Sequence, residues 1–285
     1  MPELPEVETI RSQLAAALPG RRIRAVDLLT ESMLLDVTSA EFTAALEGRR
    51  IIDVRRRGKF LVFPLNGDLF LTIHLGMTGQ VLLEGPTGPS VSPHNRFVFR
   101  LDAPASAVAV ATGAPGALLV FRDIRKFGRV HLTLSGPAAR VARMGPDAWP
   151  GDDWDEAGLS AMMRGRRAPL KAVLLDQRHV AGIGNIYADE ILFAAGLSPV
   201  RAAGSLSAHE IGKLAAEIKL TLAEGVRLRG CSISDYVDAG GEGGGFQRVL
   251  RAYGRQGQEC LRCGGTMVRT IVAGRGTAFC PSCQR

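Results

Sequence analysis

The sequence is short of lysine and of long apolar segments. Only five lysines accompany 30 arginines, and no run of 18 apolar residues occurs that could form a membrane-spanning helix. The start lacks the basic segment followed by an apolar stretch that marks a secretory signal. Secretion and membrane insertion are therefore not expected, and the cytoplasm is the expected compartment. Because lysine can act as an amine or a proton donor and arginine hardly can, the few lysines are candidates for chemistry.

Cysteine is nearly absent before residue 260, where Cys231 stands alone and is expected to be a buried small residue. The other four follow the spacing Cys260-x2-Cys263-x16-Cys280-x2-Cys283. Two such pairs fit four thiolates around one tetrahedral zinc. Two disulfides or a redox pair are the alternatives. Without an export signal disulfides are not favoured, and a redox pair would not need a second copy. We predict one structural zinc.

Positive charge is concentrated in the second half of the chain. Residues 1–160 hold 18 Lys and Arg against 18 Asp and Glu, whereas residues 161–285 hold 17 against 10. This excess favours a polyanionic partner, most simply a nucleic acid. A solvated, arginine-rich surface explains the charge alone equally well.

Hydrophobic patterning predicts an α+β protein. Apolar residues at helical spacing predict an amphipathic helix from about residue 5 to 18. Alternating patterns between about 20 and 135 predict an antiparallel β-sandwich or barrel, with Asn66-Gly67 as a two-residue hairpin turn. Residues 103–117 are expected to form a variable hairpin.

Helical patterns dominate after an acidic, Pro- and Gly-containing stretch. Helices are expected over 168–177, 185–196, 207–225 and 246–254, the third opened by a capping box of Ser207 and Glu210. Gly182 and Gly184 form a turn before Asn185, which is expected at the N-cap, and such a helix start favours an anion. We predict four regions: a catalytic β-sandwich over 1–135, a linker over 136–155, a helical DNA-binding domain over 156–254 and a zinc finger over 255–285.

Seven motifs occur in the order found in one enzyme family. They are "MPELPEVET", "RRRGKFLVF", "HLGMTG", "RDIRKFGRV", "HVAGIGNIYADE", "AYGRQGQEC" and "GRGTAFCPSCQ". Across residues 2–284 the chain resembles the formamidopyrimidine-DNA glycosylases. The resemblance implies an N-terminal helix with an antiparallel β-sandwich, a helix–two-turn–helix domain and a four-cysteine zinc-finger hairpin. It also implies a monomer that holds damaged double-stranded DNA between its domains, and work at the nucleoid.

That family excises oxidised purines, such as 8-oxoguanine and formamidopyrimidines, and then cleaves the abasic strand by β,δ-elimination. The resemblance implies that Pro2, once Met1 is removed, is the nucleophile and forms a Schiff base. An α-amino group has a pKa near 7.7–8.0, against about 10.4 for lysine, so more neutral amine is available. Glu3 would move protons, Lys59 would donate a proton during β-elimination and Arg275 would take part in δ-elimination. Because arginine is a poor proton donor, we favour phosphate binding for Arg275.

The resemblance also implies the residues that contact DNA. Met77, Arg125 and Phe127 would fill the gap left by the everted nucleotide. The remaining predicted contacts hold the DNA backbone: His74, His94, Lys126, Arg167, Lys171 and Asn185.

Two other functions stay open. One is an endonuclease VIII-like glycosylase for oxidised pyrimidines, against which Leu4, Met77 and the "RKFG" stretch argue. The other is a DNA-damage binding protein without catalysis, against which Pro2, Glu3 and Lys59 argue. Residues 232–246, in the region of the family's base-capping loop, are so rich in glycine that no conformation is predicted for them.

Overall fold

The fold comes from a computed structural model, which describes residues 1–86, 92–103, 116–149 and 155–285. The chain divides into two compact units. Unit 1 comprises Met1–Ala142 and Arg229–Gly244, and unit 2 comprises Arg143–Leu228 and Gly245–Arg285. The predicted α+β class is confirmed. Among the described residues, no helix has the length and apolar character needed to cross a bilayer. Most of the expected hairpin at 103–117 lies outside the described residues.

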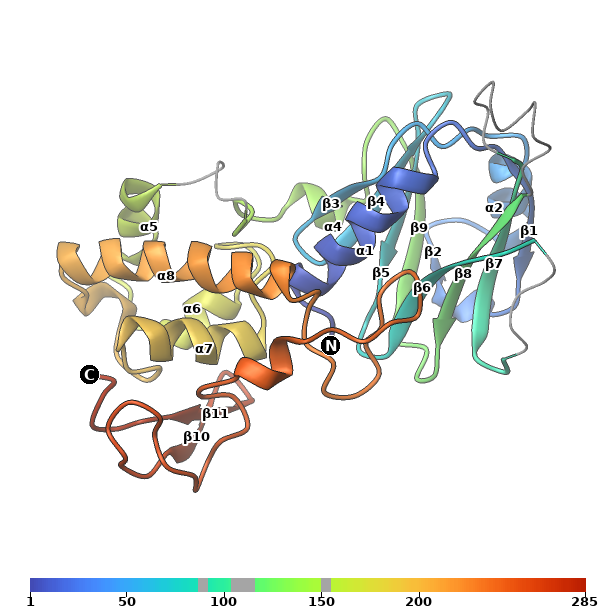
Figure 1. The fold of residues 1–285 in the computed structure, drawn as a ribbon. Helices are drawn as coiled ribbons and strands as arrows, with labels where there is room; N and C mark the ends of the chain where they lie inside the picture. The colour runs from blue at the N-terminus through green and yellow to red at the C-terminus, as the bar shows by residue number, and fades with distance from the viewer. Residues whose placement is uncertain (87–91, 104–115, 150–154) are drawn as a thin grey trace. The chain divides into compact units, whose positions relative to one another are not determined.

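Unit 1 is built around two β-sheets (Figure 1). The four-stranded sheet has the order β1-β7-β8-β6, and the five-stranded sheet has the order β2-β9-β5-β4-β3. All neighbouring strands are antiparallel except the short pair β2 and β9. The strands are β1 (Ile23–Leu28), β2 (Leu34–Leu35), β3 (Arg55–Arg57), β4 (Phe60–Leu65), β5 (Leu69–His74), β6 (Gly79–Glu84), β7 (Asn95–Leu101), β8 (Ala117–Asp123) and β9 (Arg129–Leu134).

The core of unit 1 is formed by apolar residues from both sheets. Phe63 and Ile73 of the larger sheet and Phe97 and Phe121 of the smaller one are fully buried in one cluster. This arrangement is expected where two antiparallel sheets pack their apolar faces together. Among its described residues, unit 1 also contains the helices α1 (Leu4–Ala17), α2 (Ser39–Leu46) and α4 (Ala139–Ala142), with a 3-10 turn at Glu31–Met33.

The β4–β5 connection is one residue longer than predicted. Leu65 pairs with Leu69, so the loop contains Asn66, Gly67 and Asp68. Gly67 and Asp68 both have positive φ, at 81° and 56°. The two-residue turn predicted at Asn66-Gly67 is therefore wrong. The side chain of Asn66 is used elsewhere, because its Oδ1 accepts the backbone N–H of Arg50 at 2.6 Å.

Residues 229–244 belong to unit 1, although we expected them in the helical domain. Tyr236 and Ala239 are buried in the core of the sandwich. Gln13 of α1 holds the segment with two hydrogen bonds, donating to Asp238 Oδ2 and accepting from the N–H of Ala239, each at 2.9 Å. The Asp238 carboxylate is itself buried and accepts the N–H groups of Gly240 and Glu242. The glycine-rich segment thus has a defined conformation, fixed by side chains outside and inside it.

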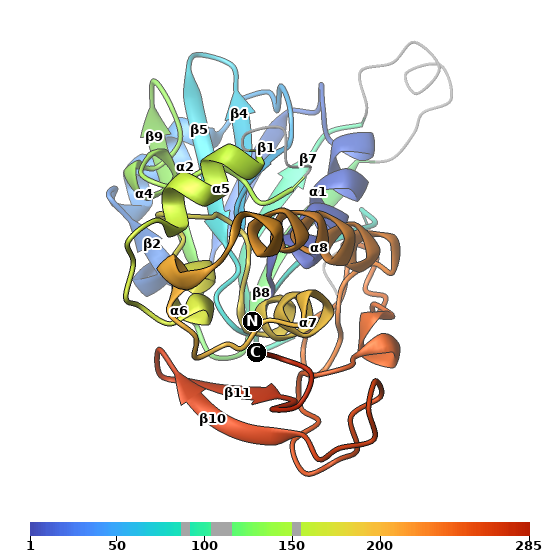
Figure 2. The same cartoon turned by 90° about the vertical axis from the view of Figure 1, so that its left-hand side faces the viewer.

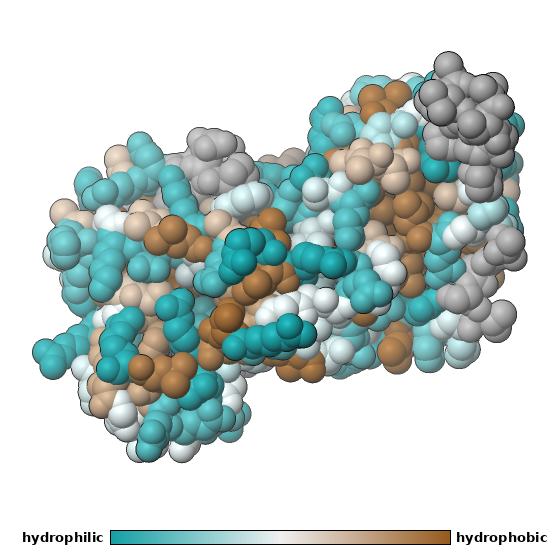
Figure 3. Space-filling view, viewed as in Figure 1, coloured by the Kyte–Doolittle hydropathy of each residue, from teal (hydrophilic) through white to brown (hydrophobic). Residues whose placement is uncertain are grey.

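Unit 2 contains four helices and a β-hairpin among its described residues. They are α5 (Glu156–Met163), α6 (Leu170–Leu175), α7 (Asn185–Ala195), α8 (Ala208–Arg227), β10 (Val268–Val272) and β11 (Arg275–Phe279), with 3-10 turns at Ala203–Ser205 and Phe246–Val249. Helices α7 and α8 pack against each other, as Figures 1 and 2 show. Hydrophilic residues cover most of the face of unit 2 shown in Figure 3, with small hydrophobic groups between them.

Several predicted helix ends are confirmed and one helix is not. The capping box of Ser207 and Glu210 opens α8, and Gly196 ends α7 with φ of 72°. The helix expected over 246–254 is only a 3-10 turn at Phe246–Val249. The chain turns away there because the Glu190 carboxylate of α7 accepts the N–H groups of residues 251, 252 and 253, which a continuing helix would use internally.

Candidate active site and DNA-contact residues

The N-terminal residues are built into the fold of unit 1. Pro2 and Glu3 are buried, and Glu3 is the N-cap of α1. Glu3 and Glu6 form a capping box, in which the Glu3 N–H donates to Glu6 Oε2 at 2.7 Å. The other Glu6 oxygen accepts the N–H of Cys231 at 2.7 Å. These hydrogen bonds fix the first turn of α1, and they therefore hold Pro2 and Glu3 in one place.

Lys59 lies in the turn between β3 and β4, and this turn is tied to α1. The Arg56 Nε donates to Glu8 of α1 at 2.9 Å, and Arg56 Nη1 donates to the carbonyl of Gly58 at 3.1 Å. The side chains of Arg56 and Glu8 are 5% and 10% exposed, so this ion pair is largely shielded from water. Helix α1 also contacts β3 and β4. The fold of unit 1 therefore places the buried Lys59 and the start of α1 on neighbouring elements.

Sequence reasoning missed Glu6, Glu8 and Arg56. The spacing of Glu3 and Glu6 was the available signal for the capping box, although the N-cap residue of this motif is usually Ser or Thr. No local pattern indicated the bridge from Arg56 to Glu8, because it joins segments 48 residues apart.

His74 is electrically neutral at physiological pH. Burial lowers its pKa to about 4, and the positive charges of Arg140 and Lys59 lower it in the same direction. Its Nδ1 accepts the N–H of Gly76 at 3.2 Å, so the ring proton is carried by Nε2. His74 can thus donate one hydrogen bond to a phosphate oxygen without carrying a positive charge.

The three residues predicted to fill the DNA gap lie together. The Arg125 guanidinium lies over the Phe127 ring at 4.4 Å, and Arg125 Nη1 lies 3.5 Å from the Met77 sulfur. Met77 and Phe127 are 37% and 47% exposed, so two apolar side chains that lie together are accessible to a partner. Lys126, between Arg125 and Phe127, is exposed and has φ of 58°. We call Met77, Arg125 and Phe127 the wedge residues.

His94 is half-buried just before β7. Its Nδ1 lies 3.4 Å from Nη2 of Arg96, and its N–H donates to the hydroxyl of Ser92 at 3.2 Å. The position of His94 is thus fixed by its neighbours in the same loop.

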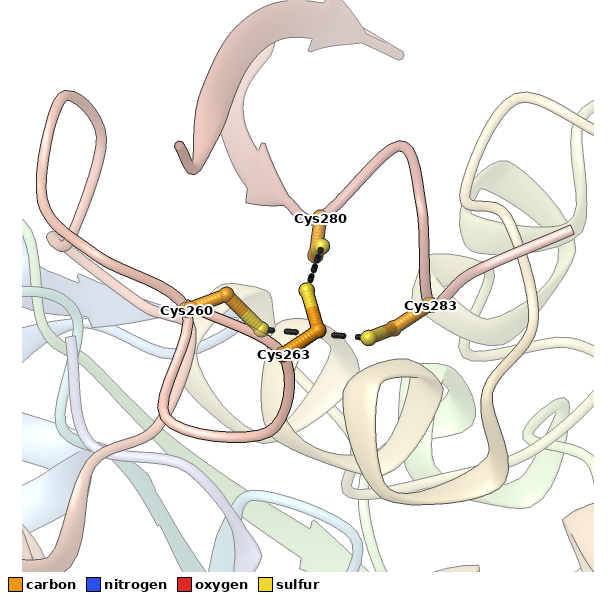
Figure 4. Close-up of side chains that lie close together, drawn as sticks. All are labelled: Cys260, Cys263, Cys280 and Cys283. Atoms are coloured by element: carbon orange, nitrogen blue, oxygen red, sulfur yellow. Dashed lines mark hydrogen bonds between the residues drawn. The ribbon is translucent and has the colours of Figure 1, made fainter. Parts of the chain in front are cut away.

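The four cysteines of unit 2 converge on one point, as Figure 4 shows. Their sulfur atoms all lie within 4.8 Å of one another, with Cys260 and Cys283 3.9 Å apart and Cys263 and Cys280 3.6 Å apart. A tetrahedral zinc with Zn–S bonds of about 2.3 Å requires sulfur atoms about 3.8 Å apart. The residues therefore fit one structural zinc, and the predicted ligand set is brought together.

The zinc-finger knuckle is attached to α7. Cys260, Cys280 and Met267 are buried against Phe193. The Arg262 guanidinium lies 4.8 Å above the Phe193 ring and donates to the carbonyls of Phe193 and Ala194 at 3.0 and 3.3 Å. A cation at the last carbonyls of a helix is stabilised by the helix dipole.

Arg275 begins β11, directly after a tight turn. Ala273 and Gly274 both have positive φ, and Val272 pairs with Arg275 across the turn. The turn that the sequence predicts at Ala273-Gly274, between two strands of the zinc finger, is confirmed, and Arg275 is exposed at its end. An exposed guanidinium on a short hairpin is well suited to a phosphate contact.

Lys171 does not contact solvent, which contradicts its prediction as a phosphate contact. Its side chain is fully buried, and Nζ lies 2.7 Å from Asp189 and 2.8 Å from the hydroxyl of Thr277. Burial raises the pKa of Asp189 to about 6, and the Lys171 charge opposes this rise. Asp189 also accepts the N–H of Ala278 at 3.2 Å. A buried ammonium must be paired with a carboxylate, and Asp189 of α7 is that partner. Lys171 and Asp189 together hold β11, because each is also hydrogen-bonded to a residue of that strand.

Asn185 and Arg167 differ from their predicted places. Gly184 is the N-cap of α7 and Asn185 is the first helical residue, where its Nδ2 donates to the carbonyl of Gly276 at 3.2 Å. Arg167 lies three residues before α6 instead of on it, and is exposed. An exposed Arg167 is compatible with the predicted contact to the DNA backbone, which stays a prediction.

Known protein families match the chain along most of its length. Models of the formamidopyrimidine-DNA glycosylase N-terminal domain and of the H2TH domain of the same enzyme match residues 1–130 and 144–237. A model of the zinc finger found in these glycosylases and in isoleucyl-tRNA synthetase matches residues 257–285. A formamidopyrimidine-DNA glycosylase of Carboxydothermus hydrogenoformans is 42% identical over the whole of both chains. The chain belongs to the formamidopyrimidine-DNA glycosylase family. Membership makes it a DNA glycosylase with one structural zinc.

Solved structures of the family have the same fold. The MutM (Fpg) protein of Thermus thermophilus is 41% identical, with a TM-score of 0.84 over 99% of this chain and 98% of that one. A Lactococcus lactis Fpg variant bound to DNA containing Fapy-dG is 33% identical, with a TM-score of 0.86 over the whole of both chains. This glycosylase therefore shares its fold with both of these proteins along nearly its full length.

Proposed function

We propose that the protein excises oxidised purines from double-stranded DNA in base excision repair and cleaves the strand at the resulting abasic site. The observation that supports this most directly is the start of unit 1, where Pro2 and Glu3 are buried directly before α1, with Glu3 as its N-cap, instead of forming a loose tail. The relatives named formamidopyrimidine-DNA glycosylase and the structures of such proteins with damaged DNA support the same activity. We expect it to act as a monomer on nucleoid DNA in the cytoplasm.

The proposed reaction begins when Met1 is removed and the secondary amine of Pro2 becomes free. The amine nitrogen attacks C1′ of the damaged nucleotide, the glycosidic bond breaks and the base leaves with the bonding electrons and a proton. The sugar ring opens with a proton supplied to its ring oxygen, and an iminium between Pro2 and C1′ remains. Glu3, held as the N-cap beside Pro2, is the proposed proton carrier.

The iminium makes the next two steps possible. It acidifies the C2′ proton, so loss of that proton expels the 3′-phosphate in β-elimination, and a second elimination expels the 5′-phosphate. Lys59, buried in the turn tied to α1, is the proposed proton donor in β-elimination. Arg275 is the proposed phosphate ligand during δ-elimination. Hydrolysis of the iminium then regenerates the Pro2 amine.

The wedge residues are proposed to fill the gap that the everted nucleotide leaves. Apolar Met77 and Phe127 replace lost base stacking, while the Arg125 cation lies near phosphate. His74, His94, Lys126 and Arg167 are proposed to contact the DNA backbone. Lys171 and Asn185 contribute instead by holding the hairpin that carries Arg275.

A second substrate class has a specific observation in its favour. A solved complex of Lactococcus lactis Fpg with DNA containing an oxidised pyrimidine is 32% identical to this chain, with a TM-score of 0.84. Comparing the release of 8-oxoguanine with the release of thymine glycol therefore tests lesion preference. If thymine glycol is released faster, the proposed preference for oxidised purines is wrong and the protein prefers oxidised pyrimidines.

Blocking the N-terminus tests the proposed nucleophile. Protein with an uncleaved N-terminal tag should lose at least about 99% of strand cleavage and keep its affinity for lesion DNA within about threefold. The same protein, cleaved to leave Pro2 as the first residue, is the matched control and should form a covalent complex with 8-oxoguanine DNA under borohydride. Full cleavage activity with the tag in place would refute the role of Pro2, and the absence of any covalent complex with the cleaved protein would refute the enzyme function.

A further inference from the structure

Three loops of unit 1 meet at Asp123, the last residue of β8. One loop (residues 75–78) carries Met77, another (92–94) carries His94, and the third (124–128) carries the other two wedge residues. Asp123 is fully buried, and its main chain is hydrogen-bonded to the second of these loops and to β7. Its N–H donates to the carbonyl of His94 at 2.9 Å, and its carbonyl accepts from Arg96 Nε at 2.7 Å.

The Asp123 carboxylate joins the two loops that carry the wedge residues. Oδ1 accepts the hydroxyl of Thr78 at 2.5 Å and the N–H of Arg125 at 3.2 Å. Oδ2 accepts the N–H of Gly128 at 2.8 Å. Thr78 follows Met77, and Arg125 and Gly128 lie at the two ends of the stretch that includes Phe127. One buried side chain therefore fixes the backbone on both sides of the wedge.

Two glycines allow the loops to approach closely enough for these bonds. A Cβ on Gly76 would lie 2.5 Å from the carbonyl carbon of Phe127 and 2.6 Å from the nitrogen of Gly128. A Cβ on Gly128 would lie 3.0 Å from the carbonyl oxygen of His74 and 3.1 Å from Asp123 Oδ2. The backbones of the two loops are thus in direct contact, with the Asp123 carboxylate beside them.

The side chains that these loops carry have little packing of their own. Met77 and Phe127 are more than one third exposed, and Arg125 and Lys126 are exposed as well. Exposed side chains cannot fix their own positions by burial, so the backbone bonds to Asp123 restrain the two loops at the residues next to them. Inserted residues must be held in place, because a displacement of about 1 Å can reduce a rate about a hundredfold.

We propose that Asp123 is a positioning residue, which holds the wedge residues in a single arrangement ready for insertion into DNA. This inference depends on the proposed function, since it concerns the eversion step of that reaction. Asp123 has no role in the chemistry at Pro2. Its effect should therefore be seen only on substrates in which a base must be unstacked and the gap filled.

The test compares Asp123→Asn with the wild type in full-length, zinc-loaded protein that begins at Pro2. Asparagine has the same shape, but its amide nitrogen cannot accept the hydrogen bonds that one of the carboxylate oxygens accepts. With an 8-oxoguanine duplex, kcat should fall ten- to a hundredfold. With an abasic site in single-stranded DNA, where no stack is disrupted, the rate of borohydride trapping should change less than about twofold. The rise in fluorescence of 2-aminopurine beside the lesion, which reports unstacking, should slow in parallel with kcat.

Two further variants keep the test decisive. Thr78→Val removes one of the hydrogen bonds to Asp123 and should slow the fluorescence change, whereas Thr78→Ser keeps the hydroxyl and should restore it. Asp68→Asn, at the exposed β4–β5 loop, is the matched control and should behave as wild type. Wild-type kinetics for both Asp123→Asn and Thr78→Val would overturn the proposal. Equal losses on both substrates would also overturn it, because they would show a general loss of structure. If the wild-type protein unstacks the base but forms no covalent complex, only the proposed chemistry at Pro2 is contradicted. The fluorescence change would still test the role of Asp123 in that case.

Discussion

Each unit uses a buried aspartate to hold a segment that carries exposed arginine, and the two do it differently. In unit 1, the donors to the Asp123 carboxylate are neutral, namely the Thr78 hydroxyl and two backbone N–H groups. In unit 2, Asp189 is paired with the charged ammonium of Lys171, which is fully buried.

The difference follows from what surrounds each aspartate. Asp123 ends a strand in a two-sheet sandwich with a large apolar core, of which Asp123 is not a member. The hairpin of unit 2 has a small core of its own, formed by Cys260, Met267, Cys280 and two residues outside the zinc finger. Such a small element needs further fixation, which the zinc and the buried ion pair supply. We therefore expect unit 2 to be much more sensitive than unit 1 to the loss of a single charged partner.

Removal of zinc should give the largest difference between the units. Structural zinc contributes about 10–16 kcal/mol in small zinc-finger peptides, so chelation should unfold the β10–β11 hairpin. Hydrogen exchange should show loss of protection in Val268–Val272, while the protection of Phe60–Leu65 in unit 1 is unchanged. Strand cleavage should fall at least tenfold, because Arg275 loses its position.

Adding zinc back should restore both protection and cleavage. Metal analysis must first confirm that the zinc has been lost. If the protection of β10 is then unchanged, the hairpin does not depend on the ion.

Breaking the ion pair of unit 2 should give the next largest effect. Lys171→Met leaves Asp189 buried without its charged partner, which should lower the free energy of unfolding by about 3–5 kcal/mol. The loss should be greater at pH 8 than at pH 5.5. Burial already raises the pKa of Asp189 to about 6 with the lysine present, and without the lysine the carboxyl stays neutral at the lower pH.

Denaturant unfolding of zinc-loaded protein measures this change. The exposed Lys213→Met is the control and should shift stability by less than about 0.5 kcal/mol. The double variant Lys171→Met, Asp189→Leu should recover most of the loss. If it is as unstable as Lys171→Met, packing and not the unpaired carboxylate is the cause.

The titration of His74 in unit 1 should give the smallest effect. Its pKa is lowered from 6.5 to about 4 in the folded protein, so the unfolded chain binds the proton more readily. Its contribution to stability is present above pH 6.5 and is lost as the pH falls to about 4, by up to about 3 kcal/mol. Thermal unfolding of the wild type and of His74→Asn at pH 7 and pH 4.5 measures this change.

The difference in stability between the two proteins should shift in favour of His74→Asn at the lower pH. A difference that does not depend on pH would mean that His74 titrates equally in the folded and unfolded states.

Sequence reasoning was most successful where the signal is local. The zinc cysteines, the capping box of α8 and the turn before Arg275 each lie within a short stretch of chain, and each is confirmed. Their geometry follows from spacing alone, because a helix turn, a β-turn and a pair of zinc knuckles each require particular residues at set intervals.

The errors occur where a distant residue decides the outcome. Lys171 was predicted to contact the DNA backbone, yet its ammonium is paired with Asp189 on the next helix and hydrogen-bonded to Thr277 in the zinc finger. The helix expected over 246–254 is interrupted by Glu190. Asp123 lies in the quoted motif "RDIRKFGRV", but its role was not predicted, because three of its partners, Thr78, His94 and Arg96, come from other parts of unit 1.

The segment 229–244 has a consequence for how the protein is made. The chain completes α8 of unit 2 before it supplies Tyr236 and Ala239 to the core of unit 1. A growing chain therefore cannot finish the β-sandwich until most of the helical unit has been synthesised. A fragment that ends near residue 142 would contain every strand of the sandwich and still lack two residues of its core. Separate expression of unit 1 would require a new connection between residues 142 and 229, and separate expression of unit 2 would require one between residues 228 and 245.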